Sequence, residues 1–137
     1  FVYLRINSYL CTSMDGYLII STSNDLVRIA ARHIVCIVAD GNYSTIFQTG
    51  NELRMVTLQL GQLERLIADQ LPQIGQTFIR VGKSLIINSN AVYYINVPKQ
   101  QLILVDIQQN RHTFSAGKEA LKTLKDWFDH NQDNERN

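Results

Sequence analysis

A short stretch of this chain, residues 78–88, combines hydrogen-bond donors with the apolar residues of a buried strand. The donors are cationic, hydroxyl and amide side chains, namely Arg80, Lys83, Ser84 and Asn88. Side chains of these types bind phosphate oxygens. Gly82 interrupts the apolar residues, and a glycine inside a strand pattern marks a bulge, a bend or a close approach of the backbone to a ligand. The sequence therefore predicts a strand that breaks at Gly82 and Lys83 and directs donors outward.

Two other predicted turns carry polar residues that could act together with this stretch. Asn42 lies in the turn predicted at residues 40–42, and Ser44 lies just after it. Gly117 and Lys118 lie where the last predicted helix begins. The spacing therefore offers three groups of donors, each on a connection between predicted elements.

Each of these groups also has an explanation that involves no ligand. Turns are polar because water solvates them. Arg80 has apolar neighbours and could be a half-buried arginine that pairs with Glu64. Lys118 could belong to a solvated face of the final helix. The residues alone leave these alternatives open beside the binding interpretation.

Catalytic and metal-binding patterns are missing from the sequence. The three histidines lie far apart, and no HExxH, GxSxG, GxGxxG, CxxC or P-loop pattern occurs. Two cysteines, Cys11 and Cys36, are too few for a disulfide framework, and Cys36 lies in an apolar run that indicates a core position. We therefore expect no enzymatic activity, no metal and no cofactor, and a reducing, cytoplasmic setting.

Length and charge narrow the class of protein further. The 137 residues suffice for one domain with its own hydrophobic core, and no apolar segment is long enough to cross a bilayer, so we expect no membrane insertion. The formal net charge is only +1, but residues 70–118 hold five Lys and Arg against one Asp. A basic middle segment between mildly acidic ends is typical of a basic face on a neutral domain.

Apolar periodicity predicts the elements that position the donors. Strands are expected at residues 2–6, 17–21, 26–30, 34–39, 43–48, 53–57, 91–97, 102–107 and 112–115, in addition to the interrupted strand at 78–88. Helical spacing predicts one helix over about residues 59–70 and a second after residue 115. Most connections are short enough for hairpins, so the expected fold class is mainly β with short helices (α+β), with antiparallel sheets.

Three pieces of the chain, in order, resemble a known family. Residues 34–43 form an apolar strand that ends in Ala-Asp-Gly-Asn-Tyr, residues 57–64 read Thr-Leu-Gln-Leu-Gly-Gln-Leu-Glu, and residues 78–88 read Phe-Ile-Arg-Val-Gly-Lys-Ser-Leu-Ile-Ile-Asn. These pieces resemble the LytTR DNA-binding domain of bacterial response regulators and related transcription factors. The resemblance covers residues 26–129. It leaves residues 1–25 as an N-terminal extension of extra strands or linker, and residues 130–137 as a disordered tail.

The resemblance implies an elongated arrangement of antiparallel β-sheets that contacts duplex DNA through loops between strands. It places Tyr43 in the core. Gly82 stands where the family often has histidine and Gly117 where some members have arginine, so base readout should differ in this chain. Carried over residue by residue, the expected DNA contacts come from Asn42, Ser44, Arg80, Gly82, Lys83, Ser84, Gly117 and Lys118.

The sequence thus predicts a sequence-specific transcription regulator that contacts double-stranded DNA through inter-strand loops. We also expect a dimer or paired binding on repeats, and a regulatory protein partner. A β-rich protein-interaction or sensory module without DNA binding is the alternative, which the near-neutral charge and the two loop glycines favour. The two functions differ in one structural respect, because a DNA-binding domain should place Lys83, Lys118 and the turn at Asn42 on one continuous edge.

Overall fold

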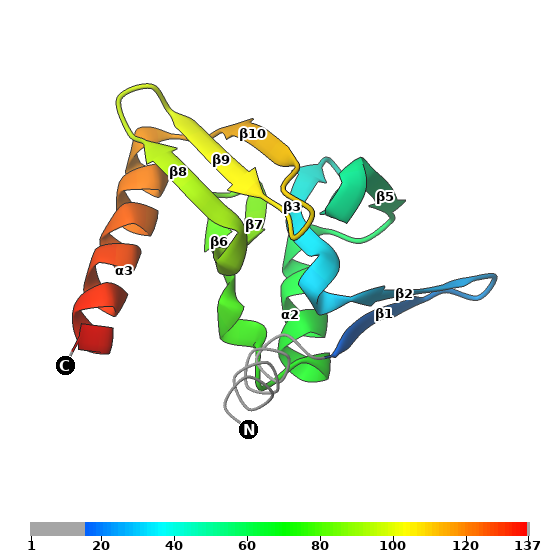
Figure 1. Ribbon diagram of the computed structural model, residues 1–137. Helices are drawn as coiled ribbons and strands as arrows, with labels where there is room; N and C mark the ends of the chain where they lie inside the picture. The colour runs from blue at the N-terminus through cyan, green and yellow to red at the C-terminus, as the bar shows by residue number, and fades with distance from the viewer. Residues whose placement is uncertain (1–15, 137) are drawn as a thin grey trace.

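A computed structural model of the protein describes residues 16–136 and arranges them in antiparallel sheets with two α-helices (Figure 1). The first sheet has two strands, β1 (Tyr17–Ser21) and β2 (Leu26–Ala30). The second has five, in the order β5-β4-β3-β7-β6, and the third has three, in the order β10-β9-β8. The mainly β fold class with antiparallel sheets is confirmed.

The remaining elements follow the predicted order closely. Their bounds are β3 (Ile34–Asp40), β4 (Tyr43–Gln48), β5 (Glu52–Val56), α2 (Leu60–Gln70), β6 (Phe78–Val81), β7 (Leu85–Asn88), β8 (Val92–Asn96), β9 (Gln101–Val105), β10 (Arg111–Ser115) and α3 (Lys118–Arg136). The structure therefore continues α3 to Arg136, where the sequence predicts a tail from residue 130. The strand predicted at 2–6 lies outside the described residues.

The break at Gly82 is a complete reversal of the chain rather than a bulge or a bend. β6 and β7 pair with each other in antiparallel register, with Val81 opposite Leu85. Gly82 has a φ of +67°, in the left-handed region that L side chains rarely adopt. A tight turn at residues 82–84 results, and the donors at the break occupy the tip of a hairpin.

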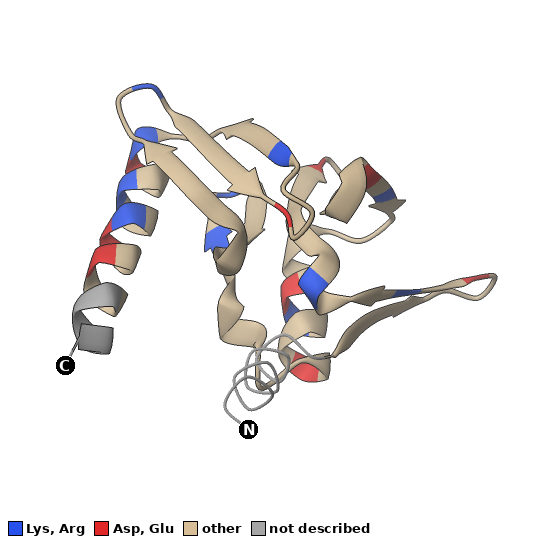
Figure 2. Ribbon diagram, in the orientation of Figure 1, with Lys and Arg blue, Asp and Glu red and all other residues tan. Residues whose placement is uncertain are grey.

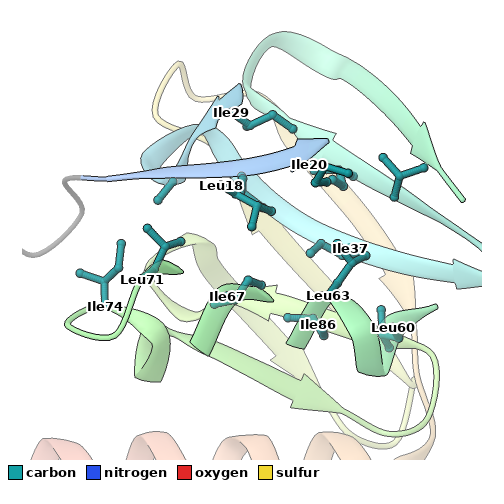
Figure 3. Packing of buried hydrophobic residues seen from close by; sticks show 14 residues of the cluster. Leu18, Ile20, Ile29, Ile37, Leu60, Leu63, Ile67, Leu71, Ile74 and Ile86 are labelled. Carbon is teal, nitrogen blue, oxygen red and sulfur yellow. The ribbon is translucent and has the colours of Figure 1, made fainter. Parts of the chain in front are cut away.

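The five-stranded sheet is the middle layer of the molecule because its inner strands, β3 and β7, are buried on both faces. One face packs against α2 and the β1–β2 hairpin, as Figure 3 shows for Ile37 and Ile86 beside Leu63. The opposite face packs against the three-stranded sheet and α3, through residues such as Cys36. Side chains alternate between the two faces of a strand, so adjacent residues such as Cys36 and Ile37 serve different cores.

The β1–β2 hairpin belongs to the folded domain, although part of the predicted N-terminal extension forms it. Leu18 and Ile20 are buried in the core that α2 shares with the central sheet. The Gln70 side chain accepts a hydrogen bond from the Ile19 amide at 2.7 Å and donates one to the Ile19 carbonyl oxygen at 2.9 Å. The amide group of Gln70 thus occupies part of the free edge of β1.

Asp106 joins the three-stranded sheet to the central sheet. One carboxylate oxygen accepts from the Gly50 amide, in the β4–β5 turn, at 3.1 Å and lies 3.1 Å from Nε2 of buried His112. The other accepts from the backbone amides of Gln108 and Asn110 at 2.9 and 3.0 Å. Burial by itself would raise the pKa of the Asp106 carboxyl, but the hydrogen bonds outweigh this effect and lower the pKa from 3.8 to about 2.

This lowered pKa predicts how stability depends on pH. A carboxyl whose pKa falls on folding stabilises the native state above its unfolded pKa, and the contribution is lost as the pH drops from about 4 to about 2. We expect Asp106→Asn to lower the free energy of unfolding at neutral pH by about 2 kcal/mol and to flatten its pH dependence in this window. Urea unfolding across the window measures both effects.

Asp129→Asn is the matched control, because Asp129 is an exposed carboxylate on α3 that pairs only with Lys125 at 3.0 Å among the described residues. Exposed ion pairs contribute little to stability, so this substitution should change the free energy of unfolding by less than about 1 kcal/mol. Equal pH dependence in the unaltered protein and in Asp106→Asn would contradict the role assigned to Asp106.

Candidate nucleic-acid interface

Two of the predicted contact loops lie side by side because of strand pairing. β3 pairs antiparallel with β4 on one side and with β7 on the other, so the end of β3 at Asp40 lies beside the start of both neighbours. The β3–β4 turn at Asn42 and the β6–β7 turn at residues 82–84 therefore occupy the same end of the sheet. The Ser84 carbonyl oxygen accepts a hydrogen bond from the Ala39 amide at 2.8 Å, next to both turns.

The connection from β10 to α3 lies next to the β6–β7 turn. Gly117 directly precedes Lys118, the first residue of α3. A Cβ atom placed on Gly82 would lie 3.6 Å from the Cβ of Ala120, in the first turn of α3. Gly82, Lys83 and Gly117 also line one groove of about 620 Å³. The three predicted loops thus meet at one end of the molecule, with the β6–β7 turn in the middle.

Arg80 lies just before the β6–β7 turn and contacts both helix α2 and the turn itself. Its Nη1 pairs with the Glu64 carboxylate on α2. Its Nη2 donates a hydrogen bond to the Lys83 carbonyl oxygen at 3.0 Å. The ion pair with Glu64, which the sequence left open, is therefore present. The guanidinium group connects α2 with the turn that carries Lys83 and restrains the backbone of that turn.

The start of α2 belongs to the same end of the molecule, which the sequence did not predict. Nε2 of Gln59, the residue before α2, donates to Oδ1 of Asn42 at 3.2 Å. The backbone N–H of Gln59 also donates to Oε1 of Gln62 at 2.8 Å, which forms part of a capping box at the start of α2. The motif at residues 57–64 indicated a helix start, but a local motif carries no information about which distant turn it will contact.

Tyr43 and Ser44 have the opposite burial to the one expected. Ser44 is fully buried, and its Oγ donates to the Leu58 carbonyl oxygen at 2.7 Å, whereas Tyr43 is 48% exposed. The cause is alternation along β4, where Ser44 shares a face with the core residue Ile46 and Tyr43 takes the other. The role of Ser44 is corrected accordingly, since it supports the turn and offers no surface to a duplex. Tyr43 takes its place at the surface.

The remaining predicted residues are exposed at this end of the molecule, namely Asn42, Gly82, Lys83, Ser84, Gly117 and Lys118. Figure 2 shows further basic residues along the start of α3 and at the β8–β9 loop. Lys99 lies in that loop. The carbonyl oxygen of the next residue, Gln100, accepts a hydrogen bond from the Ala116 backbone amide at 3.3 Å, which joins the loop to the β10–α3 connection. Two exposed carboxylates, Asp40 and Glu119, lie among these cations, so the positive charge is local and interrupted.

This end of the molecule offers hydrogen-bond donors and cations. Within residues 16–136, no group of three His, Cys, Asp or Glu side chains is arranged to hold a metal ion. No described helix is long and apolar enough to span a membrane. Cys36 is fully buried, as predicted, and burial raises the pKa of its thiol.

Fold and site together define an antiparallel β domain whose polar surface lies on neighbouring loops between strands. The chain belongs to the family of the LytTr DNA-binding domain, whose model matches residues 24–129. Its fold resembles a solved LytTr DNA-binding domain from a Bacillus cereus protein described as a methyl-accepting/DNA response regulator, with a TM-score of 0.55 and 16% sequence identity over 82% of this chain and 95% of that one. Among curated proteins, none matches this chain.

The conformation of Gly82 predicts a large effect of adding one methyl group. A Cβ atom at Gly82 would meet only ordinary van der Waals contact, so the cost of Gly82→Ala comes from its φ of +67°. We expect a loss of roughly 1 kcal/mol in the free energy of unfolding. Gly61→Ala is the matched control, because Gly61 lies in α2 with open space around it. That change should stabilise the protein by roughly 0.5–1 kcal/mol. Chemical denaturation measures the free energy of unfolding of both variants. A change of the same sign in the two variants would contradict the role assigned to the φ of Gly82.

Proposed function

We propose that this protein is a sequence-specific transcription regulator that contacts double-stranded DNA through its inter-strand loops. The observation that carries the proposal is the convergence of the β3–β4, β6–β7 and β10–α3 connections at one end of a domain whose family binds DNA. Three adjacent loops can follow a groove and its flanking phosphates without a recognition helix. The alternative function, a protein-interaction module, does not explain why these three loops converge. The DNA-binding function is therefore better supported than the protein-interaction function.

In this proposal Lys83 and Lys118 contact phosphates, because both are exposed cations on converging loops. Ser84 and the backbone amides near Gly82 and Gly117 add donors that can approach the duplex closely, since neither glycine has a side chain to hold the backbone away. These contacts position the domain but carry little sequence information.

Base readout falls to amide and aromatic side chains near the β3–β4 turn. Asn42 and Gln59 are exposed and hydrogen-bonded to each other, and Tyr43 lies beside them. Amide side chains pair with adenine edges in the major groove. We therefore propose that sequence preference resides mainly in the β3–β4 turn and the start of α2. The regulatory protein partner and the cytoplasmic location expected from the sequence stay predictions.

Lys83→Ala tests the phosphate contact. We expect weaker binding to every duplex, and a plot of log K against log salt concentration whose slope falls by about one unit, because one fewer counterion is released. Fluorescence anisotropy with promoter fragments at several salt concentrations measures the slope. Lys125→Ala removes a lysine that pairs with Asp129 on α3, and it should change the slope less. A full chain that bound no duplex even at low salt would refute the proposed function.

Glu64→Gln tests whether Arg80 positions the loop or binds phosphate itself. If Arg80 acts by restraining the Lys83 carbonyl, the loss of its Glu64 partner should weaken DNA binding roughly fivefold and leave the salt slope unchanged. This weakening is expected even though the substitution removes a negative charge. Glu119→Gln removes a similar charge beside the same loops without touching Arg80, and should not weaken binding. Tighter binding by Glu64→Gln would show that Arg80, once released, reaches a phosphate.

A further inference from the structure

Strand β5 leaves one edge of the central sheet open. Among the described strands, β4 is its only sheet neighbour, and its first four residues are exposed. Two of them are large and apolar, with Leu53 58% and Met55 63% exposed. An exposed edge strand with apolar side chains is a template for pairing with another strand.

Three other edge strands of this molecule, β1, β6 and β8, are protected. The Gln70 amide group occupies the backbone of Ile19 on the edge of β1. Helix α3 packs against β6 and β8, which are the edge strands on its side. β5 contains no lysine or proline, and its pairing with β4 runs without a bulge. It therefore lacks three of the features that prevent edge-to-edge association, namely lysine, proline and a bulge, and its two charged residues, Glu52 and Arg54, are of opposite sign.

Space for a further strand lies beside β5. A groove of about 780 Å³ is lined by residues of β5, α2 and the β1–β2 hairpin. This hairpin projects from the molecule in Figure 1. The lining of the groove includes Ile19, Arg54, Met55 and Leu66. Neither Arg54 nor Glu52 forms an ion pair with another residue in the described part of the chain. Both the apolar surface and the charges along this edge are thus available to a partner.

We propose that the occupant of this edge is β5 of a second copy of the chain, paired antiparallel about a two-fold axis at Leu53. This register places Leu53 opposite Leu53 of the partner subunit and Glu52 opposite Arg54 of the partner subunit. Two-fold symmetry repeats the ion pair, so the short sequence Glu-Leu-Arg is complementary to itself. A register centred on Arg54 would instead place two arginines opposite each other.

The pairing is weak in free solution. A strand of five residues buries less surface than the 1,200–2,000 Å² or so of a stable interface. Two domains on neighbouring DNA sites have a high effective concentration, and pairing through β5 then makes their binding cooperative. This part of the inference rests on the proposed DNA-binding function, whereas self-association of the free chain does not.

A charge exchange tests the pairing without DNA. Arg54→Glu places glutamates opposite each other across the pairing, and Glu52→Arg places arginines opposite each other. The double variant restores two ion pairs, with the positions of the positive and negative residues exchanged. Sedimentation equilibrium of the full chain should show a weak dimer. The dissociation constant of this dimer should be about tenfold larger in each single variant and should return to its original value in the double variant. Arg28→Glu, on β2, is the control and should dimerise as the unaltered chain does. A monomer at every concentration, or a double variant no better than the single ones, would overturn the proposal.

Binding to duplexes with one or two sites provides a second readout. Each single variant should bind a one-site duplex like the unaltered chain and lose cooperativity on a two-site duplex, and the double variant should regain it. If the unaltered chain bound two sites without cooperativity, the pairing would have no role on DNA and the part of the inference that concerns cooperative binding would fail. If no variant bound any duplex, the proposed function would fail, and the sedimentation result would still decide whether β5 pairs.

Discussion

Burial of β3 on both faces of the central sheet is the constraint on which the rest of the structure depends. Cys36 faces the core under the three-stranded sheet, and Ile37 faces the core that includes α2. A strand buried on both sides must have neighbours on both edges, and β4 and β7 fill those positions. Because both pair antiparallel to β3, the turns that lead into them lie at one end of the sheet.

The candidate interface follows from this packing rather than from a strongly basic composition. The net charge is +1, and carboxylates such as Asp40 lie among the cations. The fold instead fixes the position of the loops. Gln59 donates a hydrogen bond to Asn42 in the β3–β4 turn, and Arg80 donates one to the Lys83 carbonyl oxygen in the β6–β7 turn. A preorganised loop loses less conformational entropy when it binds a rigid partner such as a duplex.

Much of the candidate site could be predicted because its signals are local. The break at Gly82, the turn at Asn42 and the donors around them follow from residue types alone, and the family resemblance placed them in order. Two assignments depended on information that no local window contains. Tyr43 was expected in the core, but the pleat assigns the inner position to Ser44. Arg80 was expected either to pair with Glu64 or to contact DNA, and the structure shows the ion pair with Glu64 on α2.

The sequence by itself determined the elements and their antiparallel pairing, because apolar periodicity and turn residues act within a few positions of the chain. It also determined the family, through motifs that are contiguous in sequence. Only the tertiary structure decided which connections meet. The contact between α3 and the β6–β7 turn, the bond from Gln59 to Asn42 and the link from Asp106 to Gly50 join segments far apart in the chain. Such contacts form when elements bury their apolar faces against each other, and that outcome depends on the whole core rather than on any one segment.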